Sequence, residues 1–158
     1  MSEEKETESK EMRCSLDTLK HIVEVRNTLD TVISELMTRA QEHDQTKLSE
    51  PELSYFANAV DLRQLTFGSP EYQKSKDDLQ PALDHHYARY RHHPEHFPNG
   101  VNGMNLIDIL EMFCDWKASS KRQHDGNLVK SIETASKKYG MSSQLASIFK
   151  NTADYLDQ

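Results

Sequence analysis

Cysteine, long apolar runs and positive charge are all scarce in this sequence. The 158 residues include two cysteines, Cys14 and Cys114, which are too few for a disulfide framework and fit a reducing compartment. Apolar runs span only a few residues, so we expect no helix that crosses a bilayer, and residues 1–12 lack the apolar core of a signal peptide. With 19 basic and 26 acidic side chains, the net charge of −7 does not attract a phosphate backbone. We therefore expect a cytoplasmic protein that binds neither a nucleic-acid duplex nor a membrane.

The spacing of the apolar residues predicts an all-α protein, a compact multi-helix bundle. Residues 1–13 are polar and charged and predict a disordered acidic tail, whereas residues 14–158 predict one domain without repeats or linkers. Apolar residues recur every three or four positions, and no segment alternates as a strand does. Helices are expected at about 15–40, 51–65, 70–91 with a kink at Pro81, 104–118, 127–139 and 143–156. Two prolines and two glycines predict a loop over residues 92–103.

A stripe of carboxylates interrupts the most apolar of these helices. Asp108, Glu111 and Asp115 follow one another at i, i+3 and i+7, which places them on one face of a helix that is otherwise apolar nearly all round. Burying unpaired carboxylates costs several kcal/mol each, so the stripe needs cations. A bound metal ion is one interpretation. The others are a face turned to water, or salt bridges to Arg89, Arg91 or Lys117.

The pair His43-Asp44 favours the metal. It ends the long first helix, and an imidazole nitrogen and a carboxylate oxygen can both reach one cation there. Lys47 follows three residues after Asp44. His21 borders the apolar stripe of the same helix, and alone it indicates a hydrogen-bonded residue at the edge of a core rather than a ligand.

Five of the eight histidines lie between residues 85 and 96: His85, His86, His92, His93 and His96. Core packing does not explain so many imidazoles. Imidazole is a common ligand of divalent transition metals, so a site for such a metal does explain them. Within each adjacent pair, His85 with His86 and His92 with His93, the sequence does not choose the ligand. Arg89 and Arg91 stand between the pairs and suit an anionic substrate, since guanidinium groups match phosphate oxygens.

Taken together, these residues resemble the HD-domain superfamily of metal-dependent phosphohydrolases. That all-α family is identified by a histidine, an adjacent His-Asp pair and a later aspartate on a buried helix, matched here by His21, His43-Asp44 and Asp108. The run His43 to Lys47 is similar to the HD-x-x-K segment of HD-GYP-type enzymes, and residues 92–100 to their HH-x-E…G stretch. Residues 108–112 are similar to the D-x-x-E-M run of small HD-domain 5′-nucleotidases.

Residues from about 16 onward also resemble a small, largely uncharacterised HD-like family common in phages and bacteria, through HHPEH (92–96) and EMFCDW (111–116). The Gly-Tyr-Pro signature of the cyclic-dinucleotide hydrolases is absent, and the loop between His93 and Asp108 is short for that group. Hydrolysis of cyclic di-GMP is therefore not implied.

The resemblance implies one or two divalent ions, with Mn, Fe, Co, Mg, Zn and Ni not distinguished. The first ion would bind His21, His43, Asp44 and Asp108, where the D-x-x-E-M match favours Asp108 over Asp115. The second would share Asp44 and bind one histidine from each adjacent pair, for which we select His86 with His92 or His93.

The reaction implied is hydrolysis of a small phosphate ester, for which a nucleotide is the first choice, by metal-activated water. Lys47 and either Arg89 or Arg91, with Arg89 selected, would neutralise charge on the phosphoryl oxygens. Glu111 would orient a ligand or relay a proton, and Glu95 would be the general acid.

Two other functions stay open at the level of sequence. Four histidines and two aspartates also describe the diiron HD-domain oxygenases, which cleave C–C or C–P bonds with dioxygen. A non-catalytic helical module stabilised by its metal and acting on a partner protein is the third reading, and homodimer formation is also left open.

Overall fold

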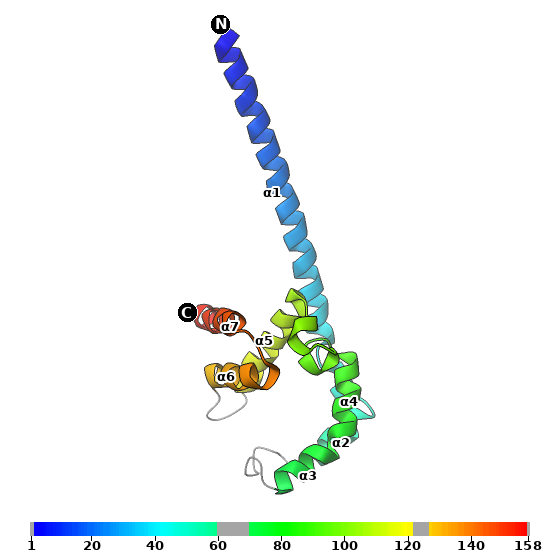
Figure 1. Cartoon of the computed structure of the whole chain (residues 1–158). Coiled ribbons are helices and arrows are strands. Elements are labelled where there is room, and N and C mark those ends of the chain that lie inside the picture. The colour runs from blue at the N-terminus through cyan, green and yellow to red at the C-terminus, as the bar shows by residue number, and fades with distance from the viewer. Residues whose placement is uncertain (1, 60–69, 122–126, 158) are drawn as a thin grey trace. The chain divides into compact units, whose positions relative to one another are not determined.

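The computed structural model describes residues 2–59, 70–121 and 127–157, and all of its regular elements there are helices (Figure 1). The prediction of an all-α protein is confirmed. By its internal contacts the chain divides into two units, Met1–Gln41 and Glu42–Gln158. Within the described residues, no helix is both long and apolar enough to cross a membrane.

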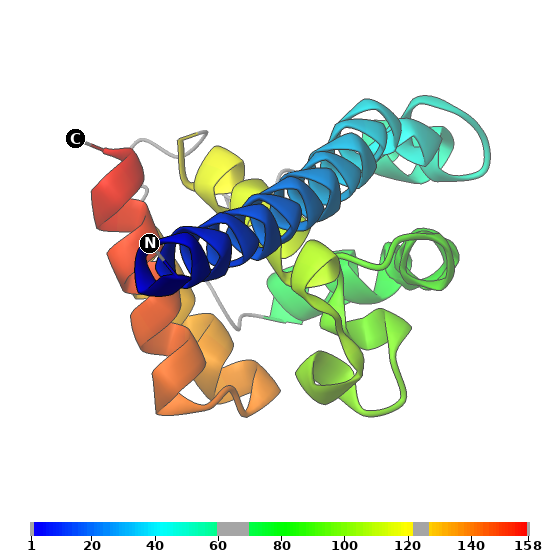
Figure 2. The same ribbon diagram turned by 90° about the horizontal axis from the view of Figure 1, so that it is seen from above.

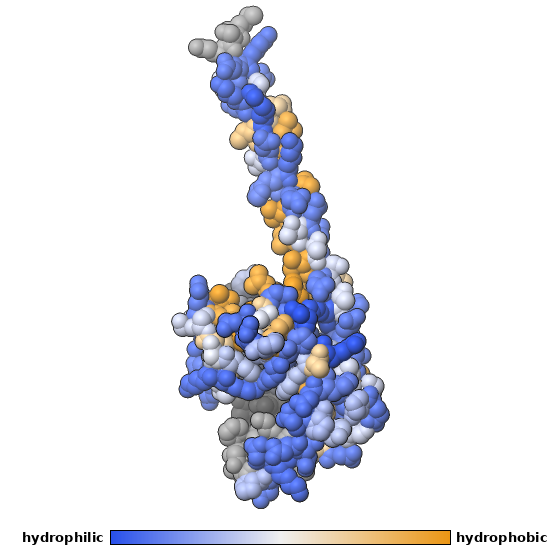
Figure 3. Space-filling view, turned by 45° about the vertical axis from the view of Figure 1, so that its right-hand side comes forward, coloured by the Kyte–Doolittle hydropathy of each residue, from blue (hydrophilic) through white to orange (hydrophobic). Residues whose placement is uncertain are grey.

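The described part of the first unit is helical throughout and belongs to α1 (Ser2–Glu42), whose last residue falls in the second unit. The sequence predicted a disordered tail over residues 1–13, whereas in the structure the helix includes residues 2–13. Neither proline nor glycine occurs before Pro51, and side chains one turn apart pair on the helix surface, as Lys10 Nζ does with Glu6 Oε1 at 2.9 Å. Apolar side chains along α1 are about half exposed, among them Leu19 at 56 % and Ile33 at 53 % (Figure 3).

In the second unit, proline and glycine define where several helices begin and end. The helix predicted at 51–65 is α2 (Glu52–Asn58), and the rest of that prediction lies outside the described residues. The helix predicted at 70–91 is divided into α3 (Pro70–Asp78) and α4 (Gln80–Arg89). Pro81 lies in the first turn of α4, where its missing N–H is not needed. The predicted loop contains two short 3-10 turns, η3 (Pro94–His96) and η4 (Gly100–Gly103).

The apolar core of the second unit lies between its last three helices: α5 (Leu106–Lys121), α6 (Leu128–Tyr139) and α7 (Ser143–Leu156). Its buried members are Met112, Phe113, Ile132, Phe149 and Ala153. Helices α6 and α7 run side by side in both ribbon views (Figures 1 and 2).

The ends of α6 and α7 follow the sequence closely. The side chain of Asn127 accepts from Lys130 N at the start of α6, and that of Ser142 accepts from Leu145 N at the start of α7. Gly140 ends α6 with a φ of 61°, a left-handed conformation that glycine adopts at little cost. These caps and the core anchor α5, which carries the carboxylate stripe.

Candidate metal centre

Imidazoles and carboxylates from four segments of the second unit come together in one place. The residues form three overlapping groups, and within each group the potential ligand atoms lie within 4.8 Å of one another. Together they contain His43, Asp44, His86, His92, His93, Glu111 and Asp115, which we call the imidazole–carboxylate cluster. The first two residues follow α1, His86 is on α4, the next two follow α4, and the last two are on α5.

Asp44 lies at the middle of the cluster. Its backbone is left-handed, with a φ of 56°, a conformation that aspartate tolerates better than most residues and that turns the chain sharply from α1 into η1 (Gln45–Leu48). Its Oδ1 lies 3.1 Å from His86 Nε2 and 3.6 Å from His92 Nε2. Its Oδ2 lies 3.6 Å from His43 Nε2 and 2.7 Å from Lys47 Nζ. The carboxylate thus presents each oxygen to a different set of groups.

Glu111, on α5, lies close to two of the imidazoles and forms a hydrogen bond with one of them, His43. Its Oε1 lies 2.9 Å from His43 Nδ1 and 2.9 Å from His92 Nδ1, and only 8 % of its side chain is exposed. A carboxylate at Nδ1 leaves the opposite nitrogen, Nε2, free for a ligand, and this carboxylate–histidine pairing is usual around metal ions. The Nε2 atoms of both histidines are the ones that lie toward Asp44.

A second carboxylate, Glu52, holds the adjacent pair on α4. His85 Nδ1 lies 2.7 Å from Glu52 Oε1, and His86 Nδ1 lies 3.0 Å from Oε2. His86 is 1 % exposed and its Nε2 lies in the cluster, whereas the side chain of His85 is 46 % exposed. The choice that sequence left open between these histidines is therefore made by burial in favour of His86.

Several buried atoms in the cluster have the chemistry to hold a cation. Within the described residues, Asp44 Oδ1 and both ring nitrogens of His92 are buried without a hydrogen bond. His92 Nδ1 lies 2.9 Å from Glu111 Oε1, but the two groups are not aligned for a hydrogen bond. His86 Nε2 and His93 Nε2 lie only 3.0 Å apart. Buried polar atoms are rarely left unpaired, and a cation would satisfy Asp44 Oδ1 together with the Nε2 lone pairs of these histidines. Nitrogen and oxygen donors at this spacing suit a divalent transition metal.

The surroundings shift the pKa values of several cluster members. The nearby carboxylates of Asp115 and Glu111 raise the pKa of His43 to about 10. Burial and the neighbouring His92 and His86 lower the pKa of His93 to about 3, so its ring is neutral at pH 7 and keeps a lone pair for a ligand. Burial raises the pKa of Asp44, but the closeness of His86 and the hydrogen bond from Lys47 outweigh burial and hold that pKa well below its usual range.

The carboxylate stripe on α5 divides between two roles. Asp115 Oδ1 lies 3.8 Å from His43 Nε2, at the cluster. Asp108 is fully buried and accepts two hydrogen bonds from Arg91, Nε to Oδ1 at 3.0 Å and Nη2 to Oδ2 at 2.9 Å. Seven residues of helix span about 10 Å, so one end of the stripe reaches the cluster and the other does not. The structure thus brings Asp115, not Asp108, to the candidate ligands.

A model of one protein family covers nearly all of the sequence. It is described as a family of unknown function (DUF5662), and it matches residues 10–155. The chain belongs to this family. No curated protein and no solved structure matches it. The matched range of this DUF5662 chain includes every member of the imidazole–carboxylate cluster.

Two other predicted site residues of the DUF5662 chain, Arg89 and Glu95, do not belong to the cluster. Arg89 is exposed in the last turn of α4. Glu95 pairs with α6, with its Oε1 2.9 Å from both Lys138 Nζ and Tyr139 Oη. His21 is exposed on α1, in the first unit, and its role as a ligand stays a prediction.

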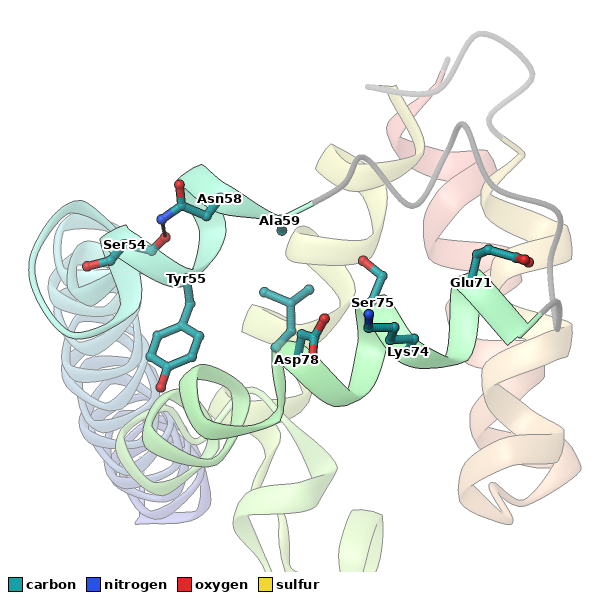
Figure 4. A pocket seen from close by; sticks show the side chains of 9 residues that line it. Ser54, Tyr55, Asn58, Ala59, Glu71, Lys74, Ser75 and Asp78 are labelled. Atoms are coloured by element: carbon teal, nitrogen blue, oxygen red, sulfur yellow. Dashed lines mark hydrogen bonds between the residues drawn. The ribbon is translucent and has the colours of Figure 1, made fainter.

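A cavity of about 700 Å³ lies elsewhere in the second unit (Figure 4). Side chains of α2 form one side of it and side chains of α3 the other. The cavity is lined by Ser54, Tyr55, Asn58, Ala59, Glu71, Lys74, Ser75, Asp78 and Leu79. None of these residues belongs to the imidazole–carboxylate cluster.

Proposed function

We propose that this chain is a metal-dependent phosphohydrolase that acts on a small phosphate ester, with a nucleotide as the first choice. One observation carries the proposal: the Nε2 atoms of His43, His86 and His92 converge on the two carboxylate oxygens of Asp44. The resemblance of the His43-Asp44 pair and of the HHPEH run to HD-domain phosphohydrolases supports the same reaction class. The two free cysteines support a cytoplasmic location.

The two faces of Asp44 support a centre of two divalent ions. Oδ1 faces His86 and His92, and His93 belongs to the same group of ligand atoms. Oδ2 faces His43, which forms a second group with Asp44 and Asp115. We propose that Asp44 would help to hold both ions and that Asp115 would take the place predicted for Asp108.

A bound divalent ion would supply water of lowered pKa and would offset charge on the phosphoryl group. The residues of the chain hold and complement that chemistry. Glu111 fixes the ring of His43 through its Nδ1 atom and lies 2.9 Å from Nδ1 of His92. Lys47 places its ammonium 2.7 Å from Asp44 Oδ2, at the edge of the cluster, where it can neutralise charge that develops on phosphoryl oxygens.

Hydrolysis by purified variants tests this proposal. We expect the wild type to hydrolyse p-nitrophenyl phosphate or members of a nucleotide panel when Mn, Co or Mg is supplied. His43→Ala and Asp44→Asn should each lower the rate by more than about 100-fold, beyond the usual loss for an outer-shell residue. Asparagine tolerates the left-handed backbone at position 44, so the second variant changes the ligand without straining the turn.

The matched control is His96→Gln. His96 belongs to the same HHPEH run, but its Nδ1 lies 2.8 Å from the backbone oxygen of Tyr87 and not in the cluster. The His96→Gln variant should hydrolyse the substrate at the same rate as the wild type. Hydrolysis that persists in metal-depleted Asp44→Asn protein contradicts the proposal.

The diiron oxygenase remains the second candidate because of the composition of the cluster. It contains four histidines and two aspartates, counting Asp44 and Asp115. Iron in the purified protein together with substrate-dependent oxygen consumption, and no phosphate release, would favour this chemistry. A metal that raises the thermal midpoint without turnover of any substrate would favour the non-catalytic module.

A further inference from the structure

Glu52 is a buried carboxylate that neither the sequence patterns nor the proposed chemistry uses. It is the first residue of α2, and none of its side chain is exposed. Removing a carboxylate from water costs several kcal/mol unless its oxygens receive hydrogen bonds. A first-turn helix position could face water at no such cost, so the burial of Glu52 needs a reason.

Its two oxygens are used by two neighbouring imidazoles. Oε1 lies 2.7 Å from His85 Nδ1, and Oε2 lies 3.0 Å from His86 Nδ1. An ionised carboxylate only accepts hydrogen bonds, so the proton of a neutral His86 ring is on Nδ1. The lone pair is then on Nε2, the atom that lies 3.1 Å from Asp44 Oδ1 and 3.0 Å from His93 Nε2.

We propose that Glu52 is a positioning residue of the metal centre, which fixes the tautomer and the ring orientation of His86 so that Nε2 faces the ion. This inference rests on the proposed function, because it assumes an ion at the cluster. Glu52 does for His86 what Glu111 does for His43, since each carboxylate lies at the Nδ1 atom of its histidine. The centre would therefore be held between two outer carboxylates, one on α2 and one on α5.

If Glu52 only stabilised the packing of α2 against α4, a different result would be expected. Its loss would then lower the free energy of unfolding but leave the ligand field of a bound metal unchanged. A positioning residue alters the basicity and direction of the ligand, and such outer partners commonly change metal affinity by about 10–100-fold. Spectra of the bound metal separate the two.

The test compares Glu52→Gln with Glu50→Gln, loaded with Co(II). Glutamine keeps the shape but removes the charge, and hydrogen bonds to charged acceptors are about twice as strong as neutral ones. We expect Co(II) affinity, measured by chelator competition, to fall about 10–100-fold in Glu52→Gln, with a shift of the visible absorption bands. Glu50 is exposed two residues away, so its variant should match the wild type. Unchanged affinity and bands in Glu52→Gln overturn the proposal.

Two further measurements keep the inference testable. If Glu52→Gln does not fold, Glu52→Asp, which is too short to reach both imidazoles, should show the same loss of affinity and the same kind of band shift. If the wild type binds no metal, the proposed function fails by itself. The His86 tautomer, read by long-range ¹H–¹⁵N NMR in the metal-free protein, then decides the role of Glu52. Nδ1–H in the wild type and its loss in Glu52→Gln support it, and Nε2–H in the wild type overturns it.

Discussion

Asp44 shows how two adjacent residues can serve one site. In a regular helix, neighbouring side chains point about 100° apart. Here α1 ends at Glu42, and the left-handed conformation of Asp44 turns the chain so that its Oδ2 lies 3.6 Å from His43 Nε2. Non-glycine residues with positive φ cost energy and cluster at functional sites, so this turn itself supports a role for the pair.

Metal affinity should rise with pH above neutrality. Because the pKa of His43 is raised to about 10 in the metal-free protein, its ring is protonated at pH 7, and an ion must displace that proton. We expect roughly tenfold tighter apparent binding per pH unit for each proton displaced, up to about pH 10. Titration calorimetry in buffers of different ionisation enthalpy measures the released proton. Binding that is independent of pH between 7 and 9 contradicts His43 as a ligand.

Glu95 is expected to act on stability rather than on catalysis. Burial raises its pKa, but hydrogen bonds from Lys138 and Tyr139 outweigh this and lower the pKa, so Glu95 is a carboxylate at neutral pH and a poor proton donor. Glu95→Gln should keep the hydrolytic rate and lose about 1 kcal/mol of unfolding free energy at pH 7.

The loss of unfolding free energy in Glu95→Gln should depend on pH in the direction that the lowered pKa of Glu95 sets. A carboxyl group whose pKa is lower in the folded state stabilises the protein above its unfolded pKa, and the contribution disappears as the pH falls through the folded-state value. The difference between wild type and Glu95→Gln in urea unfolding should therefore vanish in acid. A large loss of rate with unchanged stability would restore Glu95 as the general acid.

Sequence predicted candidate ligands well where they are neighbours in the chain. His43, Asp44, His92 and His93 stand in adjacent pairs, and the structure brings both pairs to the cluster. Glu52 was not predicted, because it contacts imidazoles 33 and 34 residues away. Its position after Pro51 indicated only the start of a helix, and a buried carboxylate cannot be distinguished from an exposed one by spacing.

At the scale of elements, one face of α5 carries a carboxylate that lies at the candidate site and another that pairs with an arginine. Asp108 and Asp115 share a stripe, and helical spacing alone could not tell which turn meets the cluster. The structure places Asp115 beside His43 and pairs Asp108 with Arg91. A helix that joins the core to the site explains why a mostly apolar sequence keeps three carboxylates.

The two ends of the stripe provide a matched pair of variants. Asp115→Asn should weaken metal binding and lower the stability of the metal-free protein by less than Asp108→Asn does. Asp108→Asn should leave metal affinity unchanged but cost about 1–3 kcal/mol of unfolding free energy, because it breaks a bidentate pair with a buried carboxylate. Urea unfolding and chelator competition on both variants measure this. The opposite assignment, with metal lost in Asp108→Asn, would return Asp108 to the centre.

Element boundaries were predictable where caps or prolines define them. Asn127, Ser142 and Gly140 mark ends that the structure confirms. Pro70 begins α3, and Pro81 lies in the first turn of α4. Residues 2–13 were harder, since a charged segment without an apolar face fits either a disordered tail or a helix with pairing side chains.

At the scale of the whole molecule, the candidate chemistry belongs to the second unit. All seven members of the imidazole–carboxylate cluster lie within residues 42–158, and their outer partner Glu52 does too. The first unit carries His21 and a row of half-exposed apolar side chains. His21 as a ligand and the homodimer both stay predictions.

The metal content of the purified full-length protein decides whether the cluster is a metal centre. Elemental analysis by mass spectrometry, after dialysis against metal-free buffer, should find one or two transition-metal ions per wild-type chain. Asp44→Asn should retain almost none, while His96→Gln should match the wild type. A wild type without stoichiometric metal, or an Asp44→Asn variant with the same content, would contradict the assignment.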